Sequence, residues 1–361
     1  MDEDAAPWLF LCDPQFEPAL LNELGIDGGA PYTLSPGWIQ LPHAPERQCL
    51  PAAFARQTLP AALEFPIESV KRGSKELAEN IIAFFRKRAE PERWRLHVIG
   101  PDLASSRVQL IEEHVRRLLK ERRRLLFRTL SADTAENAYF EGGEALVQIA
   151  LVHANKVALS IVPDVLNNPV RPCLSPFAAG SIAIPEDRAA PSRAYRKLLE
   201  AQLQFGFEIQ PGQSCVDLGA SPGGWSYVAL RQGARVLAID RSELRADLMA
   251  HPALEFLSAD AFRYVPPEPV DWLLSDVVAF PERIRELTER WLSGGWCRYF
   301  CVTVKFRGDQ NYSQLIEFKG LLRKYAAPFF LRRLGENKNE VTMMGACLTP
   351  DQSLRAVNHT L

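Results

Sequence analysis

The second half of the chain contains five short apolar runs separated by segments with helical spacing, and this alternation constrains the fold more than any other feature. The runs cover residues 214–218, 235–239, 254–257, 270–274 and 298–304. Alternating strands and helices predict a parallel sheet with helices on both faces, the doubly wound α/β class. Ligands bind such sheets at the carboxyl ends of the strands, where the strand order reverses. The residues that end each run are therefore candidates for a functional site.

Each apolar run ends in, or is followed by, a charged residue. In chain order these residues are Asp217, Asp240, Asp260, Asp276 and Lys305. A single aspartate in such a place is commonly a helix cap. Four acids at successive strand ends, with a lysine at the fifth, instead indicate a cofactor cleft.

The first strand end opens a glycine-rich loop, DLGASPGGW, over residues 217–225. Its candidate cofactor-binding residues are Asp217, Gly219, Ser221, Pro222, Gly223, Gly224 and Trp225. Glycine lets a backbone come close to a ligand, although a plain tight turn is the alternative. The dinucleotide fingerprint G-x-G-x-x-G is absent, which disfavours a nicotinamide-dependent oxidoreductase. Asp240 lies 23 residues after Asp217, a spacing typical of an acid that accepts hydrogen bonds from a ribose.

A loop led by an acid suits a nucleoside that carries a positive centre and an amino-acid tail, and S-adenosyl-L-methionine is such a ligand. We expect Asp217 to lie near its ammonium and sulfonium groups and the glycines near its methionine part. Asp260 would accept a hydrogen bond from the adenine amino group, with a helix cap as the alternative. The sequence therefore predicts an S-adenosyl-L-methionine site.

Two patterns resemble the FtsJ-like ribose 2′-O-methyltransferases. The segment DLGASPGGWS resembles the first motif of that family, and the order Lys197, Asp276, Lys305, Glu340 resembles its Lys-Asp-Lys-Glu tetrad. Further segments resemble the bacterial 23S rRNA cytidine 2′-O-methyltransferases, which join a THUMP-type RNA-binding region to an FtsJ-like domain. These segments are LFLCDPQFEPALLNEL, FARQ at 54–57, and NNPVRPCLSPFAAGSIAIPEDRAAPSRAYRKLLEA. The resemblance covers nearly the whole chain and is strongest over 186–347.

The resemblance implies a division of roles among the tetrad. A ribose hydroxyl is a poor nucleophile at neutral pH, so a base must take its proton during attack on the methyl group. Lys305 is the candidate base, Lys197 a cation that favours its neutral form, and Asp276 the group that orients it and also borders the cofactor. Glu340 would position Lys197 or the ribose. Ser192 matches the family's entry to the Lys197 helix and would touch the cofactor, with a helix cap as the alternative.

The first half of the chain mixes predicted strands and helices, which indicates an α+β region ahead of the methyltransferase sheet. The predicted parts are a ferredoxin-like region at 1–62, a THUMP-type RNA-binding domain at 63–165, a Pro-rich linker at 166–190 and a Rossmann-like methyltransferase domain at 191–361. Within the second part, one helix is expected over about 106–127. The linker follows from its prolines and weak periodicity, whereas the THUMP-type and methyltransferase assignments are what the resemblance implies.

RNA binding requires positive surface, and the chain as a whole does not provide it, because its net charge is −2. A local stripe is therefore needed, and the helix at 106–127 supplies one. The basic residues of the stripe are Arg116, Arg117, Lys120, Arg122, Arg123 and Arg124, with Arg128 directly after the expected end of the helix. We interpret them as phosphate contacts, with a solvated helix face as the alternative. A second basic stretch runs through Lys319, Arg323, Lys324, Arg332 and Arg333.

The most favoured function is thus 2′-O-methylation of RNA, with 23S rRNA as the substrate. Methylation of tRNA or another RNA, and a non-enzymatic role in RNA binding or ribosome assembly, remain alternatives. The seven cysteines lack C-x-x-C spacing, so no metal is expected. No apolar run approaches the roughly 20 residues of a membrane span, and the acidic start does not resemble a signal peptide. A cytoplasmic protein is expected.

Overall fold

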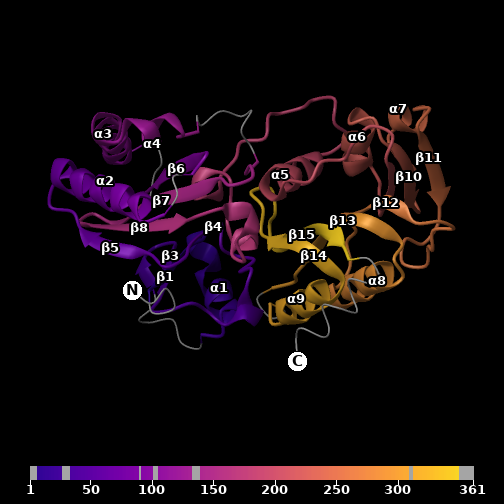
Figure 1. Cartoon of the computed structure of the whole chain (residues 1–361). Helices are drawn as coiled ribbons and strands as arrows, with labels where there is room; N and C mark the ends of the chain where they lie inside the picture. Colours follow the sequence, from indigo (N-terminus) through magenta and orange to yellow (C-terminus); the bar gives the residue numbers. More distant parts are fainter. Residues whose placement is uncertain are drawn as a thin grey trace. The chain divides into compact units, whose positions relative to one another are not determined.

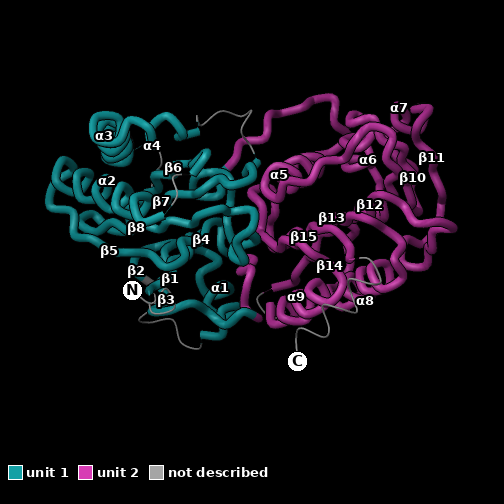
Figure 2. The backbone as a smooth tube through the Cα atoms, viewed as in Figure 1, with its two compact units in different colours: residues 1–47, 54–181 teal, residues 48–53, 182–361 magenta. Residues whose placement is uncertain are grey.

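The computed structural model divides the chain into two compact units (Figure 2). The first unit holds residues 1–47 and 54–181, and the second holds residues 48–53 and 182–361. The structure describes residues 6–26, 33–88, 91–100, 105–131, 139–308 and 312–348. Each unit has its own sheets and its own core.

The first unit contains two four-stranded sheets, with strand orders β2-β3-β1-β4 and β5-β8-β7-β6. The first sheet is made by β1 (Trp8–Leu11), β2 (Thr33–Ser35), β3 (Trp38–Leu41) and β4 (Gln57–Leu59). The second is made by β5 (Leu63–Pro66), β6 (Trp94–Ile99), β7 (Ala145–His153) and β8 (Lys156–Val162). The helices are α1 (Glu17–Glu23), α2 (Val70–Arg86), α3 (Ser106–Arg122) and α4 (Arg124–Arg128).

Helices α2 and α3 pack on the second sheet through apolar faces (Figure 1). Leu77 and Ile81 of α2 and Ile111 and Val115 of α3 are each wholly buried, as their four-residue spacing predicts. The expected single helix over 106–127 is wrong in one respect. Arg123 leaves helical geometry at φ −145° and ψ 68°, so the helix is broken into α3 and α4. The hydrophobic pattern continues across this break, which is why the sequence did not reveal it.

The second unit contains one seven-stranded sheet with the order β11-β10-β9-β12-β13-β15-β14. Its strands are β9 (Ser214–Leu218), β10 (Arg235–Asp240), β11 (Leu254–Ser258), β12 (Val270–Ser275), β13 (Cys297–Lys305), β14 (Ala326–Arg332) and β15 (Glu340–Cys347). The first five are parallel, and β15 pairs antiparallel with both β13 and β14. The predicted doubly wound α/β sheet is confirmed.

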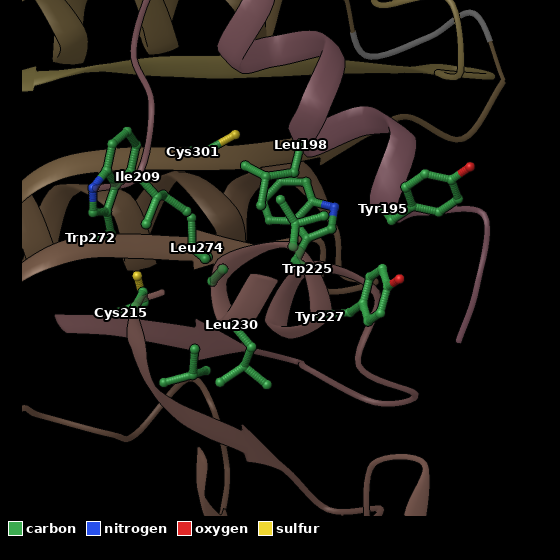
Figure 3. Packing of buried hydrophobic residues seen from close by; sticks show 14 of the residues in the cluster. Tyr195, Leu198, Ile209, Cys215, Trp225, Tyr227, Leu230, Trp272, Leu274 and Cys301 are labelled. Carbon is green, nitrogen blue, oxygen red and sulfur yellow. The ribbon is translucent and has the colours of Figure 1, made fainter. Parts of the chain in front are cut away.

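Helices cover both faces of this sheet (Figure 1). They are α5 (Tyr195–Phe205), α6 (Gly224–Arg231), α7 (Ala246–Met249), α8 (Pro281–Ser293) and α9 (Gln314–Tyr325). Figure 3 shows the core on one face, where Leu198 of α5 and Trp225 of α6 pack with Trp272 and Leu274 of β12. Large buried side chains of this kind contribute most of the favourable free energy of folding.

The strand order reverses between β9 and β12. From β9 the chain proceeds to β10 and β11 on one side, and then returns to place β12 and β13 on the other. A crevice at the carboxyl ends of β9 and β12 is the place where such sheets bind ligands. The hydroxyl of Ser275 donates to the Leu218 carbonyl (3.0 Å), which joins the two strands at this point.

The predicted linker at 166–190 is packed over residues 171–180 and has no buried residue over 181–190. Its first part, up to Ser181, belongs to the first unit and contains three short 3₁₀ turns, Val165–Asn167, Arg171–Cys173 and Ala178–Gly180. The remainder belongs to the second unit. The four-part division of the chain remains a prediction.

Within the described ranges, no helix combines the length and apolar character needed to cross a membrane.

Asp217 is a buried carboxyl group at the end of β9. It is 2% exposed, and its Oδ2 accepts a hydrogen bond from the Ser226 hydroxyl (2.7 Å) in the first turn of α6. Burial raises the pKa of Asp217 to about 7, and the nearby Asp240 and Asp276 act in the same direction. Asp217 therefore ties the glycine-rich loop to α6 and is not an exposed carboxylate.

We predict that Asp217→Asn makes the protein's stability less dependent on pH. In the wild type, the folded state keeps this proton to a higher pH than the unfolded state does. The contribution of Asp217 to the free energy of unfolding therefore falls by about 1.4 kcal/mol per pH unit between about pH 4 and pH 7. Asparagine still accepts from Ser226 and has no proton to lose. Urea titrations at about pH 5 and about pH 8 measure the difference. Asp271→Asn on β12 is the control, and equal pH dependence in wild type and Asp217→Asn would contradict the prediction.

Candidate active site

The four predicted tetrad residues form one network of ion pairs. The Lys197 ammonium lies 3.1 Å from Asp276 Oδ2 and 2.6 Å from Glu340 Oε1. The Lys305 ammonium lies 3.0 Å from Asp276 Oδ1 and donates to the Asp276 carbonyl at 2.6 Å. The structure thus brings together two cations and two carboxylates with Asp276 at the centre.

Each member of the network comes from a different element of the second unit. Lys197 projects from the first turn of α5, and Asp276 directly follows β12. Lys305 is the last residue of β13 and pairs in register with Glu340, the first residue of β15. Because β12 and β13 are neighbouring parallel strands, Asp276 and Lys305 emerge from the same edge of the sheet.

Lys197 is a fixed cation. Burial acts to lower its pKa, but the carboxylates of Asp276 and Glu340 outweigh burial, so its pKa lies above the usual value for lysine. Its side chain is 11% exposed, whereas that of Lys305 is 21% exposed. Lys305, held by one carboxylate and a carbonyl, is therefore the lysine that is more accessible to a substrate.

Asn339 supports this arrangement and was not identified from the sequence. Its amide donates to the carbonyls of Phe306 (3.2 Å) and Gly308 (3.1 Å), and its Oδ1 accepts from the Tyr312 hydroxyl (2.6 Å). It therefore ties the segment after Lys305 to the start of β15. Each contact spans about 30 positions in the chain, so only the antiparallel pairing of β13 and β15 reveals it.

Two acids lie at the strand ends on the other side of β9. Asp240, the last residue of β10, accepts hydrogen bonds from the backbone amides of Ser221 and Ser242, both at 3.0 Å. Asp260 accepts from the Phe262 amide (2.9 Å) and is paired with Arg241 (3.3 Å). The Phe262 amide is the main reason that the pKa of Asp260 is lowered. Each carboxylate also caps its own loop. The geometry is therefore compatible with the predicted cofactor binding and with the alternative of a structural cap.

The glycines of the loop are required by the protein's own packing. Gly219 and Gly223 have φ angles of +75° and +109°, which strain any other residue. A Cβ on Gly219 would lie 2.7 Å from Val277, and one on Gly223 would lie 2.3 Å from Leu248. The sequence led us to expect that these glycines make room for the methionine part of a cofactor. The packing instead shows that Val277 and Leu248 leave no space for a side chain at these positions.

Ser192 and Trp225 flank the same loop. The Ser192 hydroxyl is buried and has no hydrogen-bond partner among the described residues, and a Cβ on Gly224 would lie only 2.6 Å from it. A buried hydroxyl without a partner is unfavourable unless a ligand satisfies it. Trp225 is 2% exposed and donates to the Ala194 carbonyl (2.9 Å), so its indole belongs to the core. Pro222 follows a cis peptide bond within the loop.

Several arginines of the predicted basic stripe on α3 are neutralised. Arg116 pairs with Glu112 (2.7 Å), and Arg117 pairs with Glu121 (3.4 Å). Arg122 is bonded to Glu79 of α2 (2.8 Å). Arg123 is partly buried at the helix break, whereas Lys120 and Arg124 are exposed. The structure thus separates arginines that pair with a glutamate, Arg116, Arg117 and Arg122, from the exposed Lys120 and Arg124, for which no such pair is found among the described residues.

The second basic stretch is not a continuous positive surface, because two of its members are buried. Lys319 is wholly buried, and its ammonium donates to the Cys49 carbonyl (2.6 Å). Arg332 is 3% exposed and donates to Gln204 (3.2 Å). Arg323 also bonds the carbonyl of Leu50 (2.6 Å). Lys319 and Arg323 hold the segment 48–53 within the second unit.

The described residues contain no group of three or more His, Cys, Asp or Glu side chains that could hold a metal ion.

The sequence of the chain is similar to those of known methyltransferases. Residues 190–299 match the FtsJ-like methyltransferases. The ribosomal RNA large subunit methyltransferase M of Marinomonas sp. (strain MWYL1) is 37% identical over 183 residues, which are 47% of this chain and 52% of the relative. The protein of the same name from Alkalilimnicola ehrlichii is 28% identical over 364 residues and 94% of both chains. The chain therefore spans about half the length of the Marinomonas relative and nearly all of the Alkalilimnicola relative.

Among solved structures, a ribosomal RNA methyltransferase from Plasmodium falciparum is 16% identical with a TM-score of 0.35, covering 44% of this chain and 98% of that chain. The family resemblance predicted from the motifs is confirmed by the sequence matches. The chain is similar to the ribosomal RNA large subunit methyltransferases M along nearly its whole length, and its residues 190–299 match the FtsJ-like methyltransferases.

Proposed function

We propose that the protein transfers a methyl group from S-adenosyl-L-methionine to a ribose 2′-hydroxyl of RNA, with a cytidine of 23S rRNA as the target. The network of Lys197, Asp276, Lys305 and Glu340 carries this proposal, because it places an accessible lysine against a fixed cation and a shared carboxylate. The names of the relatives support ribosomal RNA as the substrate. A cytoplasmic location follows from this substrate and is part of the proposal.

Lys305 is the general base in this proposal. In its neutral form it accepts the proton of the ribose hydroxyl while the oxygen attacks the methyl carbon and the carbon–sulfur bond breaks. The Lys197 ammonium shares the Asp276 carboxylate with Lys305. Asp276 holds the Lys305 side chain in place, and Glu340 holds Lys197. Proton transfer and positioning are thus assigned to separate residues.

The residues around β9–β11 fit the proposed cofactor, which supplies an already activated methyl group. The unsatisfied Ser192 hydroxyl and the carboxylates of Asp240 and Asp260 lie on the segments that border the glycine-rich loop. Asp240 would bind the ribose hydroxyls, and Asp260 the adenine amino group. The backbone of the loop and Asp276 would border the methionine part. Asp217 would act indirectly, by holding α6 against the loop.

The first unit is proposed to be the THUMP-type RNA-binding part. Exposed positive charge on α3 and α4 supports this, because phosphate contacts provide most of the affinity of non-specific RNA binding. Lys120, Arg124 and Arg128 are exposed, and no carboxylate pairs with them among the described residues. Arg116, Arg117 and Arg122, which are paired on the helix surface, would contribute less to RNA binding.

We predict that Lys305→Ala lowers the rate of methyl transfer by about 10²- to 10⁴-fold, the usual contribution of a general base. Affinity for S-adenosyl-L-methionine should stay nearly unchanged, because the lysine acts on the ribose. Lys305→Arg should fail similarly, since a guanidinium stays protonated. Single-turnover transfer of a labelled methyl group to 23S rRNA measures the effect.

The control for this experiment is Lys338→Ala, which removes an exposed lysine two residues before Glu340. If Lys305→Arg transferred methyl groups at the wild-type rate, the base would have to be another group. The tetrad would then act only by electrostatics and positioning. If Lys305→Ala also retained the wild-type rate, the proposed function of the site would be wrong.

We predict that Asp240→Ala weakens binding of S-adenosyl-L-methionine by about 10- to 150-fold, the loss of a charge-assisted hydrogen bond of about 1.5–3 kcal/mol. Asp240→Asn, which keeps an acceptor oxygen, should lose less. Calorimetric titration gives both affinities. Asp247→Ala removes an exposed carboxylate from α7 and is the control. A wild-type affinity in both Asp240 variants would show that this acid only caps its loop.

We predict that replacing Lys120, Arg124 and Arg128 together with Ala weakens RNA binding. The slope of log affinity against log salt should decrease by about 0.7–0.9 for each lost phosphate contact. Replacement of the paired Arg116 and Arg117 is the matched control and should change the slope less. Fluorescence anisotropy with labelled RNA at several salt concentrations measures both. An unchanged slope in the triple variant would identify this surface as a solvated helix face.

A further inference from the structure

Phe280 is exceptional among the aromatic side chains of the described residues, because it is the only one that is exposed. The residue is 50% exposed, and the neighbouring Val278 is 76% exposed. Apolar side chains in such positions are costly to solvate, and a cluster of them often marks an interaction surface. Phe280 and Val278 are therefore a candidate interaction surface.

Phe280 lies directly beside the tetrad in the chain. It is four residues after Asp276, so its Cα is at most about 15 Å from that of Asp276. It is also the N-cap of α8, and its carbonyl accepts hydrogen bonds from the amides of Arg283 (3.0 Å) and Ile284 (3.2 Å). The helix thus fixes the backbone from which the ring projects.

Arg307 places a cation on this ring. Its guanidinium carbon lies 4.5 Å from the centre of the Phe280 ring. Arg307 is two residues after Lys305, which limits its Cα to about 8 Å from that of Lys305. Arg307 is exposed, and no carboxylate forms an ion pair with it among the residues that the structure describes. An aromatic ring and a planar cation thus meet where the chain leaves β12 and β13.

We propose that Phe280 and Arg307 form a stacking platform for an unstacked RNA base, at or next to the nucleotide whose ribose reaches Lys305. Proteins that recognise single-stranded RNA stack its bases on aromatic rings and on arginine guanidinium planes. The guanidinium also supplies positive charge for the phosphate of the same strand. The platform rests on the proposed function, because it specifies how that site holds its RNA.

A purely structural role for the pair is less consistent with the geometry. A ring that served the core would be buried, as Trp291 of α8 is. An arginine that served a surface network would be paired with a carboxylate, as Arg285 of α8 is with Glu317 (3.1 Å). Phe280 and Arg307 instead contact each other and remain open to solvent. Their exposed planar surfaces match the chemistry of a nucleobase.

The test compares variants at both positions in RNA binding and in methyl transfer. Phe280→Leu keeps apolar bulk and removes the aromatic face, whereas Phe280→Tyr keeps that face. The probes are transcribed 23S rRNA and a labelled single-stranded 20-nucleotide RNA of mixed sequence, each with the full-length protein. Val265→Ala, at a side chain 52% exposed in the same unit, is the control. Affinity for S-adenosyl-L-methionine is measured for every variant to confirm an intact cofactor site.

We expect Phe280→Leu to weaken RNA binding by about 5- to 150-fold, the range for loss of one base–aromatic stack. Its salt slope should be unchanged, because no charge is lost, and Phe280→Tyr should restore the affinity. Arg307→Ala should weaken binding and lower the salt slope by about 0.7. Wild-type RNA affinity in Phe280→Leu, or equal losses in Phe280→Leu and Phe280→Tyr, would overturn the platform. A wild-type protein that binds RNA without methylating it would instead contradict the proposed function and leave the binding comparison valid.

Discussion

The active site depends on one carboxylate, Asp276, which is shared by the ammonium groups of Lys197 and Lys305. Two cations this close repel each other and lose hydration on burial, so they are stable only with opposing charges beside them. Glu340 supplies the second carboxylate, and the network is then electrically balanced. Its four members come from α5, β13, β15 and the residue after β12, so these elements must be assembled before the site exists.

The same network separates the roles of two chemically identical lysines. Lys197 is the more buried of the two and contacts both carboxylates, which hold it in the charged form. Lys305 keeps more exposure at the end of β13, where a ribose can approach. A general base must alternate between charged and neutral forms, whereas a fixed cation must not. In the proposed mechanism, burial and partner number, and not residue type, therefore determine which lysine has which role.

Positive charge in the sequence proved to have several functions in the structure. Lys319 and Arg332 are buried and satisfy carbonyl and amide groups of the fold. Arg116 and Arg117 are neutralised by glutamates one turn away on their own helix. Arg307, which was not part of either basic stretch, lies on an aromatic ring beside the tetrad. A count of basic residues along the chain therefore does not locate a binding surface, because burial and pairing decide which charges are available.

The sequence alone determined the doubly wound sheet and the glycine-rich loop, and its resemblance to a known family indicated the four tetrad residues. Hydrophobic periodicity and the residue that ends a strand can both be read from a short stretch of sequence. The order of strands in such a sheet then brings the carboxyl ends of the strands together. Only the tertiary structure decided how Asn339 joins β13 to β15, why Gly219 and Gly223 are glycines, and that Phe280 meets Arg307. Each of these depends on a contact between segments 25 or more positions apart in the chain, and neither periodicity nor motif spacing records such contacts.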